Sequence, residues 1–170
     1  RPKLGEGVFL APGSHVIGDV EIGDDSSVWF NTVIRGDVDS VRIGYHTNIQ
    51  DGCVCHVMMD EAPLLIGNYV TVGHAVMLHG CVVESHCLIG MRSTILNNVS
   101  IGEGSIVAAG ALLTENFSVP PRSLVMGVPA RIKRTVTDSE LANIDEYARR
   151  YVEYKETYLE NNFPEISAGL

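Results

Sequence analysis

Aromatic residues and positive charge are both scarce in this chain of 170 residues. Phe, Trp and Tyr make up 6% of the sequence, and Lys plus Arg number 12 against 21 Asp plus Glu, for a net charge of -9 with neutral histidines. A protein that binds a phosphate backbone needs a basic face, so this balance excludes nucleic acid as a partner. No apolar run reaches the roughly 18 residues that a membrane-spanning helix needs, so we expect no membrane partner.

Cysteine is sparse as well, because four in 170 residues are too few for a disulfide scaffold. The first six residues contain no apolar core of a signal peptide. We therefore expect reduced thiols and a cytoplasmic location. In excess are Val and Ile, which together number 34, and Gly, which numbers 17. A chain rich in β-branched residues and glycine but poor in aromatics is atypical of a helical bundle.

Aliphatic residues recur every six positions along most of the chain, and glycine often follows them. The inward positions of this repeat are Val16, Ile22, Val28, Ile34, Ile43, Ile49, Cys55, Ile66, Val72, Leu78, Val83, Ile89, Ile95, Ile101, Val107 and Leu113. A period of six fits neither a helix, at 3.6, nor an amphipathic strand, at two. It is typical of a parallel β-helix, in which three repeats form a triangular coil of about 18 residues, stacked on its neighbour at about 4.8 Å.

Two interruptions and one change of composition divide the chain. Segments 37–42 and 58–65 hold three and five extra residues, which we interpret as loops at a corner of the coil. From Thr137 a capping box with Glu140 begins an amphipathic pattern at helical spacing. We predict an all-β solenoid over 1–135, an α-helix over 136–162 packed alongside it, and a tail over 163–170.

Three of the six histidines stand out by their place in the repeat. His56 and His79 each follow an inward residue, and the register places them on the same face of successive coils, pointing outward. His74 lies on the preceding face, so it cannot easily reach the other two within one chain. In a trimer, His56 and His79 of one chain would face His74 of the next. Three imidazoles with an open fourth position are typical of a catalytic zinc site.

The chain resembles the gamma-class carbonic anhydrase family of hexapeptide proteins, from about residue 5 to residue 135. The segments that carry the resemblance are SVW at 27–29, VIRGD at 33–37, TNIQDG at 47–52, VTVGH at 70–74, LHGC at 78–81, IGM at 89–91 and LVMGVPA at 124–130. The resemblance implies a left-handed coil and a homotrimer with zinc held between subunits by His56, His74 and His79. It also implies reversible hydration of CO2 to bicarbonate by a metal-bound hydroxide. Three imidazoles also suit Fe2+ or Co2+.

The resemblance assigns roles to five further residues. Gln50 matches a residue that hydrogen-bonds the metal-bound solvent, and Asn48 matches a nearby polar contact. Arg35 and Asp51 match a salt-linked pair near the site, and Asp37 matches a neighbouring acid. We therefore expect these five side chains to lie around the metal.

The sequence departs from the family's best-studied type where a proton would leave the site. Val38 replaces a glutamate just after the Arg-x-Asp motif, and the short loop 58–64 has only Asp60 and Glu61 where that type has a long acidic loop with a proton-shuttling glutamate. Hydration of CO2 at high turnover needs a route for the proton. We therefore expect metal binding and trimer formation, with activity that is low, dependent on buffer or absent.

Other functions compatible with the repeat remain open. One is an acyl-CoA thioesterase that uses the same metal site, and another is a catalytically weak metal-binding scaffold trimer. A third is a hexapeptide acyltransferase, which needs a catalytic histidine and a groove for coenzyme A but no metal.

Of the cysteines, Cys53, Cys55 and Cys87 fall at inward or small-residue positions and are predicted to pack in the core. Cys81, two residues after His79, is a candidate for a role beside the site or at a subunit boundary.

Overall fold

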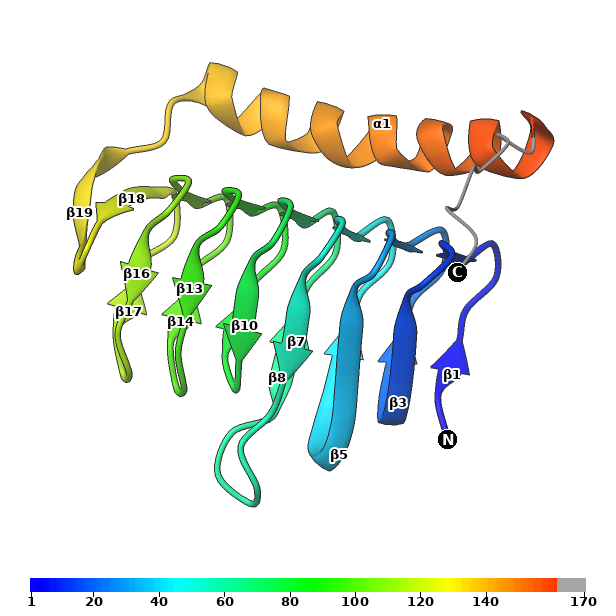
Figure 1. Cartoon of the computed structure of the whole chain (residues 1–170). Helices are drawn as coiled ribbons and strands as arrows, with labels where there is room; N and C mark the ends of the chain where they lie inside the picture. The colour runs from blue at the N-terminus through cyan, green and yellow to red at the C-terminus, as the bar shows by residue number, and fades with distance from the viewer. Residues whose placement is uncertain (162–170) are drawn as a thin grey trace, which may run out of the picture.

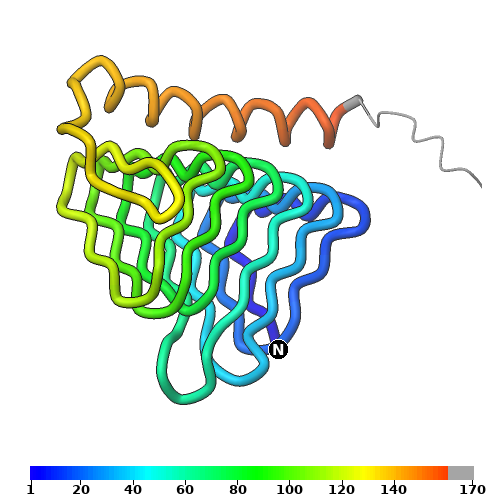
Figure 2. Tube along the Cα trace, turned by 60° about the vertical axis from the view of Figure 1, so that its left-hand side comes forward, coloured from blue at the N-terminus to red at the C-terminus, as the bar shows by residue number. Residues whose placement is uncertain are grey.

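The computed structural model describes residues 1–161 and shows a parallel β-helix of about seven turns, with one helix lying along it (Figure 1). The coils are roughly triangular, and the chain advances along the stack from the N-terminus toward residue 135 (Figure 2). The helix α1 (Asp138–Asn161) then runs back along the stack in the opposite direction. The solenoid and its accompanying helix are therefore confirmed.

The strands form two sheets. The eight-stranded sheet contains β2 (Phe9–Leu10), β4 (Ser27–Val28), β6 (Asn48–Ile49), β9 (Thr71–Val72), β12 (Leu88–Ile89), β15 (Ile106–Val107), β18 (Ser123–Gly127) and β19 (Ala130–Thr135). The eleven-stranded sheet contains β1 (Lys3–Leu4), β3 (His15–Ile22), β5 (Val33–Ile43), β7 (Val54–His56), β8 (Leu64–Ile66), β10 (Met77–His79), β11 (Val82–Val83), β13 (Thr94–Ile95), β14 (Ser100–Ile101), β16 (Leu112–Leu113) and β17 (Ser118–Val119). The second sheet covers two faces of the triangle, because β5 pairs with both β7 and β8.

Hydrogen bonds between coils measure the repeat directly. The hydroxyl of Ser100 donates to the hydroxyl of its register partner Ser118, 18 residues further on, which is the length of an uninterrupted coil. The first interruption lengthens the step to 21 residues, as between Ser26 and Thr47, and the second lengthens it to 23. The six-residue period is confirmed, and each extra residue is accommodated without breaking the stack.

The two interruptions leave the coil at the same corner, and they differ in form. In segment 58–65, residues 58–63 form a projecting loop between β7 and β8, closed by a bridge between Met58 and Ala62, and the last two residues already belong to β8 (Figures 1 and 2). Segment 37–42 falls within β5 instead of forming a separate loop, but the register shifts inside it: Gly18 pairs with Gly36 and Val20 pairs with Val41, so the three extra residues are inserted at residues 37–40. The backbones of β3 and β5 approach each other closely at Gly18, which has φ +85° and where a Cβ would lie 2.1 Å from the carbonyl oxygen of Gly36.

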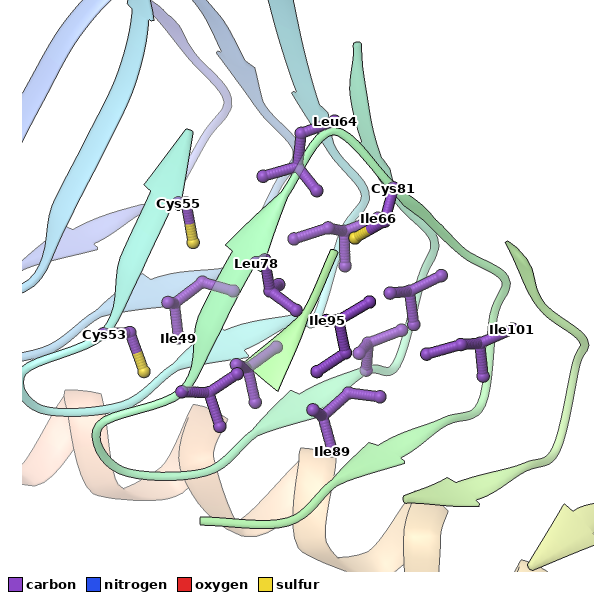
Figure 3. Close-up of a cluster of buried hydrophobic side chains, with 14 of the residues drawn as sticks. Ile49, Cys53, Cys55, Leu64, Ile66, Leu78, Cys81, Ile89, Ile95 and Ile101 are labelled. Atoms are coloured by element: carbon purple, nitrogen blue, oxygen red, sulfur yellow. The ribbon is translucent and has the colours of Figure 1, made fainter. Parts of the chain in front are cut away.

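Stacked aliphatic side chains fill the interior of the coil. Figure 3 shows Ile49, Leu78 and Ile95 pointing inward, and all three are completely buried. The narrow interior explains the scarcity of aromatic residues. Cys53, Cys55 and Cys87 are also completely buried, as predicted. The proposed role of Cys81 beside the site was wrong, because this side chain is 1% exposed and packs in the same core.

The helix begins with the predicted capping box and packs on the eight-stranded sheet, against β4 and β9. The amide of Thr137 donates to Glu140, and the amide of Glu140 donates to the hydroxyl of Thr137. Near its other end, Lys155 is completely buried and donates to the carbonyl of Gly7 and to Asp25. Residue 162 and the predicted tail 163–170 lie outside the described residues. In the described part of the chain, no helix is long and apolar enough to cross a membrane.

Candidate metal centre

His56 and His79 lie side by side on adjacent strands. β7 and β10 pair in parallel with these two residues directly opposite each other, as the repeat predicts. Each side chain points outward because it follows an inward residue, Cys55 or Leu78, in a strand whose side chains alternate. Nδ1 of His56 lies 3.1 Å from Nε2 of His79, and the rings are inclined at 63°. Two imidazole nitrogens therefore converge on one point at the surface of the coil.

The outer nitrogens of both rings are held by neighbouring side chains. Nε2 of His56 lies 3.0 Å from a carboxylate oxygen of Asp37, and Nδ1 of His79 lies 2.6 Å from Oδ1 of Asn97. Both oxygens are acceptors, so each outer nitrogen carries the hydrogen and donates it. In the neutral rings this leaves Nδ1 of His56 and Nε2 of His79 without hydrogen, so two lone pairs face each other.

Two facing lone pairs repel, and either a proton or a metal ion between them relieves the repulsion. Two nitrogen ligands at about 2.0–2.1 Å on a tetrahedral zinc would be about 3.3 Å apart, close to the 3.1 Å found here. Metal-bound histidines also usually donate their other N–H to a carboxylate or a carbonyl, as both rings do here. The arrangement of His56 and His79 therefore fits two of the ligands of a divalent metal.

Asp37 connects this pair of histidines to Arg35. The guanidinium of Arg35 forms an ion pair with the Asp37 oxygen that does not contact His56. The hydrogen bond from His56 lowers the pKa of Asp37, and the hydrogen bond from Arg35 lowers it further. The carboxylate therefore remains charged and keeps accepting the proton of His56.

A second group of predicted residues lies at the other end of the same strands. Nδ1 of His74 lies 2.6 Å from a carboxylate oxygen of Asp51. The buried side chain of Gln50 donates to Oδ1 of Asn48 at 3.1 Å, and Asn48 donates to the hydroxyl of Thr71 at 2.9 Å. Asp51 precedes β7 and His74 precedes β10, whereas His56 and His79 end those strands. The structure thus places Arg35, Asp37, His56 and His79 at one edge of this face and Asp51 and His74 at the other, with Asn48 in β6 of the adjoining eight-stranded sheet and Gln50 directly after it.

The separation has two consequences for the predicted site. Within residues 1–161, no three His, Cys, Asp or Glu side chains come together in a way that could hold a metal ion. This agrees with the expectation that His74 cannot join His56 and His79 within one chain. The predicted pairing of Arg35 with Asp51 is likewise not made within the chain, because Arg35 pairs with Asp37 and Asp51 pairs with His74.

A cavity of about 410 Å3 opens between α1 and the eight-stranded sheet, beside the second group. Gln50, Thr71 and His74 line it from the coil, and Tyr147 and Tyr151 line it from the helix. Burial raises the pKa of Tyr151 to about 12, and the neighbouring charge of Asp51 acts in the same direction. Tyr151 therefore stays protonated at neutral pH. The cavity is much larger than a molecule of CO2 requires.

Sequence reasoning missed Asn97 and Glu115. Asn97 contacts His79 directly, and its Nδ2 lies 3.3 Å from a carboxylate oxygen of Glu115. Each of these residues lies 18 positions after the one before it, which is the length of one coil. A search for polar residues one coil after each histidine would have found Asn97.

Comparison with known proteins gives relatives over nearly the whole chain. A protein of Methanocaldococcus jannaschii named "Probable carbonic anhydrase" is 50% identical over 154 residues, covering 91% of this chain and 96% of that protein. The carbonic anhydrase of Geobacillus kaustophilus is 41% identical, covering 92% and 86%. The mitochondrial gamma carbonic anhydrase 2 of Arabidopsis thaliana is 39% identical over 95% of this chain, which spans 60% of the length of that relative.

Solved structures and a family model agree on the repeat. A Bacillus cereus protein described as a candidate acetyltransferase superposes with a TM-score of 0.90 at 40% identity, covering 93% of this chain and 91% of that one. A hexapeptide transferase family protein from Anaplasma phagocytophilum gives 0.87 at 37% identity, covering 92% of each. Residues 1–36 and 80–115 match the model described as bacterial transferase hexapeptide, six repeats. By its relatives and its repeat, the chain belongs to the gamma-class carbonic anhydrase family of hexapeptide-repeat proteins.

Proposed function

We propose that this chain forms a homotrimer that binds a divalent metal, zinc in the first instance, at each boundary between subunits. The observation that carries the proposal is the 3.1 Å contact between Nδ1 of His56 and Nε2 of His79, whose other ring nitrogens both face acceptors. His74 of a neighbouring subunit would complete the set, since Asp51 holds its Nδ1 and leaves its Nε2 available. The proposed reaction is the reversible hydration of CO2 to bicarbonate, which the carbonic anhydrase relatives support.

The roles of the chain's own residues follow from their contacts. A divalent metal held by three imidazoles would supply a water of lowered pKa. Asp37 and Asn97 keep the two lone pairs of His56 and His79 directed at the metal position. Gln50, whose amide is held by Asn48, would orient solvent or bicarbonate beside His74. Arg35 would bind Asp51 across the boundary, or would remain on Asp37 and neutralise its charge.

In the proposed enzyme, the rate of hydration would be limited by the transfer of a proton away from the site. The carboxylate of Asp37 already accepts hydrogen bonds from His56 and Arg35, so it is not free to collect another proton. Asp60 and Glu61 are the only acids of the projecting loop. We therefore propose slow hydration that accelerates with buffer concentration, since buffer can replace a missing shuttle.

The test combines metal analysis with stopped-flow CO2 hydration on the purified chain. We expect one equivalent of metal per chain and an activity that chelation abolishes and zinc restores. His56→Ala should lose both the metal and the activity, whereas the control His15→Ala, an exposed histidine on β3, should lose neither. Purified protein with far less than stoichiometric metal, which also fails to take up added Zn2+, Fe2+ or Co2+, would overturn the proposal.

The cavity beside Gln50 and His74 favours a second candidate function. Its volume of about 410 Å3 and its tyrosine wall suit an acyl group better than CO2. The Bacillus cereus and Anaplasma structures, described as transferases, point the same way. Hydrolysis of acyl-CoA that depends on the metal would support a thioesterase, and acetyl transfer that survives chelation would support an acyltransferase. A trimer that holds metal but is silent in all three assays would be a scaffold.

A further inference from the structure

His79, Asn97 and Glu115 form a polar column along one corner of three successive coils. Nδ1 of His79 lies 2.6 Å from Oδ1 of Asn97, and Nδ2 of Asn97 lies 3.3 Å from a carboxylate oxygen of Glu115. His79 and Asn97 are partly buried, whereas Glu115 is exposed to solvent. The column begins at the metal position and ends at the protein surface.

Glu115 determines which way the amide of Asn97 points. A carboxylate only accepts hydrogen bonds, so it takes a hydrogen from the NH2 group of Asn97. The amide oxygen is then turned toward His79. If the amide were rotated by half a turn, its oxygen would face the carboxylate of Glu115 and its NH2 group would face the N–H of His79. The contact with Glu115 would then be repulsive whichever tautomer His79 adopts, so Glu115 by itself selects one orientation of the amide.

The orientation of Asn97 in turn selects the tautomer of His79. An amide oxygen accepts the hydrogen on Nδ1, which leaves Nε2 of His79 as the nitrogen with a lone pair. That nitrogen faces Nδ1 of His56. In the other neutral tautomer, Nε2 would carry hydrogen and could not bind a metal.

We infer that Asn97 and Glu115 are positioning residues that hold His79 in the tautomer and orientation of a metal ligand. The inference rests on the proposed metal site for its functional consequence, but the effect on the tautomer is independent of any metal. Asn97 acts directly on His79, and Glu115 acts through Asn97. Residues that orient a ligand from outside typically change metal affinity by about 10–100-fold when they are replaced.

The test uses three variants and one control, all purified as the full chain and checked for an unchanged oligomeric state. Asn97→Leu removes the acceptor, Asn97→Asp keeps an acceptor that needs no orientation, and Glu115→Ala releases the amide of Asn97. Glu103→Ala, an exposed glutamate at another corner, is the control. The first readout is the nitrogen chemical shifts of His79 in metal-free protein labelled at histidine. The second is the affinity for Co2+, followed by visible absorption.

We expect wild type, Asn97→Asp and Glu103→Ala to show hydrogen on Nδ1 of His79, and Asn97→Leu to show a mixture of tautomers. Affinity for Co2+ should fall by about 10–100-fold in Asn97→Leu, by less in Glu115→Ala, and hardly at all in Asn97→Asp. Asn97→Leu with an unchanged tautomer or an unchanged affinity would overturn the inference. If wild type bound no Co2+, the proposed metal site would fail, and the tautomer measurement would still decide the role of Asn97.

Discussion

Nδ1 of His56 and Nε2 of His79 face each other at 3.1 Å across two paired strands, and in the neutral rings neither nitrogen has a hydrogen to donate. Asp37 accepts a hydrogen bond from the other nitrogen of His56, and Asn97 accepts one from the other nitrogen of His79, which fixes this arrangement. In the neutral rings the contact is unfavourable, and a proton or a metal ion between the two nitrogens would relieve it. It therefore supports the proposed metal site, whose third proposed ligand, His74, lies at the far edge of the same face.

Mixing two inactive variants should restore metal binding. His74→Ala keeps the pair of His56 and His79, and His79→Ala keeps His74, so each alone should lose the metal. In a trimer with both kinds of subunit, one boundary brings the intact pair against an intact His74. Refolding equal amounts together should restore about one quarter of the sites. Metal analysis checks this, and stoichiometric metal in His74→Ala alone would contradict the ligand assignment.

The fluorescence of Trp29, the single tryptophan of the chain, should show whether α1 is packed against the coil. Tyr151 meets the ring of Trp29 edge-on at 5.3 Å, and Trp29 is 5% exposed. Tyr151→Ala should lower the free energy of unfolding by about 2 kcal/mol, less than for a fully buried aromatic residue, because Tyr151 is half-buried. Its tryptophan emission should shift to longer wavelength. Tyr147→Ala, at a residue that is 43% exposed, should change neither, as measured by denaturant unfolding and fluorescence.

All four cysteines should be unreactive in the native protein. Burial raises the pKa of Cys53, Cys81 and Cys87 to about 12, and it raises that of Cys55 well above its usual value. Since the thiolate is the reactive form, a thiol reagent at mildly alkaline pH should modify none of them. In concentrated guanidinium it should modify four. Rapid modification of Cys81 in the native state would show that this residue is accessible near the site after all.

The N-terminus of α1 should weaken in acid. The hydrogen bond from Arg134, followed by that from the backbone of Thr137, lowers the pKa of Glu140 from 4.5 to about 2. A group whose pKa is lowered on folding stabilises the native state above its unfolded value, and this stabilisation disappears as pH falls through the folded value. Glu140→Gln should therefore be less stable than wild type at neutral pH. The difference should shrink between pH 4.5 and pH 2 in thermal unfolding curves, and a difference independent of pH would contradict the assignment.

Much of the fold follows from the spacing of inward residues such as Ile49, Val72 and Ile89. Because each coil contacts only its neighbours, a constant step of about 18 residues defines both the core and the pairing of strands. The same reasoning correctly places His56 opposite His79. It places the insertion at 37–42 but not its form, because an inserted segment can leave the sheet as a loop or stay within a continuous strand as a shift of register, as β5 does beside β3.

The sequence accounts for the solenoid and the neighbouring histidines, because both depend on contacts one coil apart. It also accounts for the capped helix, because the cap joins residues three positions apart. The direction of the Asn97 amide, the ion pair of Asp37 with Arg35 and the burial of Cys81 depend on how side chains of different coils meet. Side-chain orientation is not encoded in the period, because it is settled by hydrogen-bond partners that approach only when the coils stack. The proposed chemistry rests on those partners.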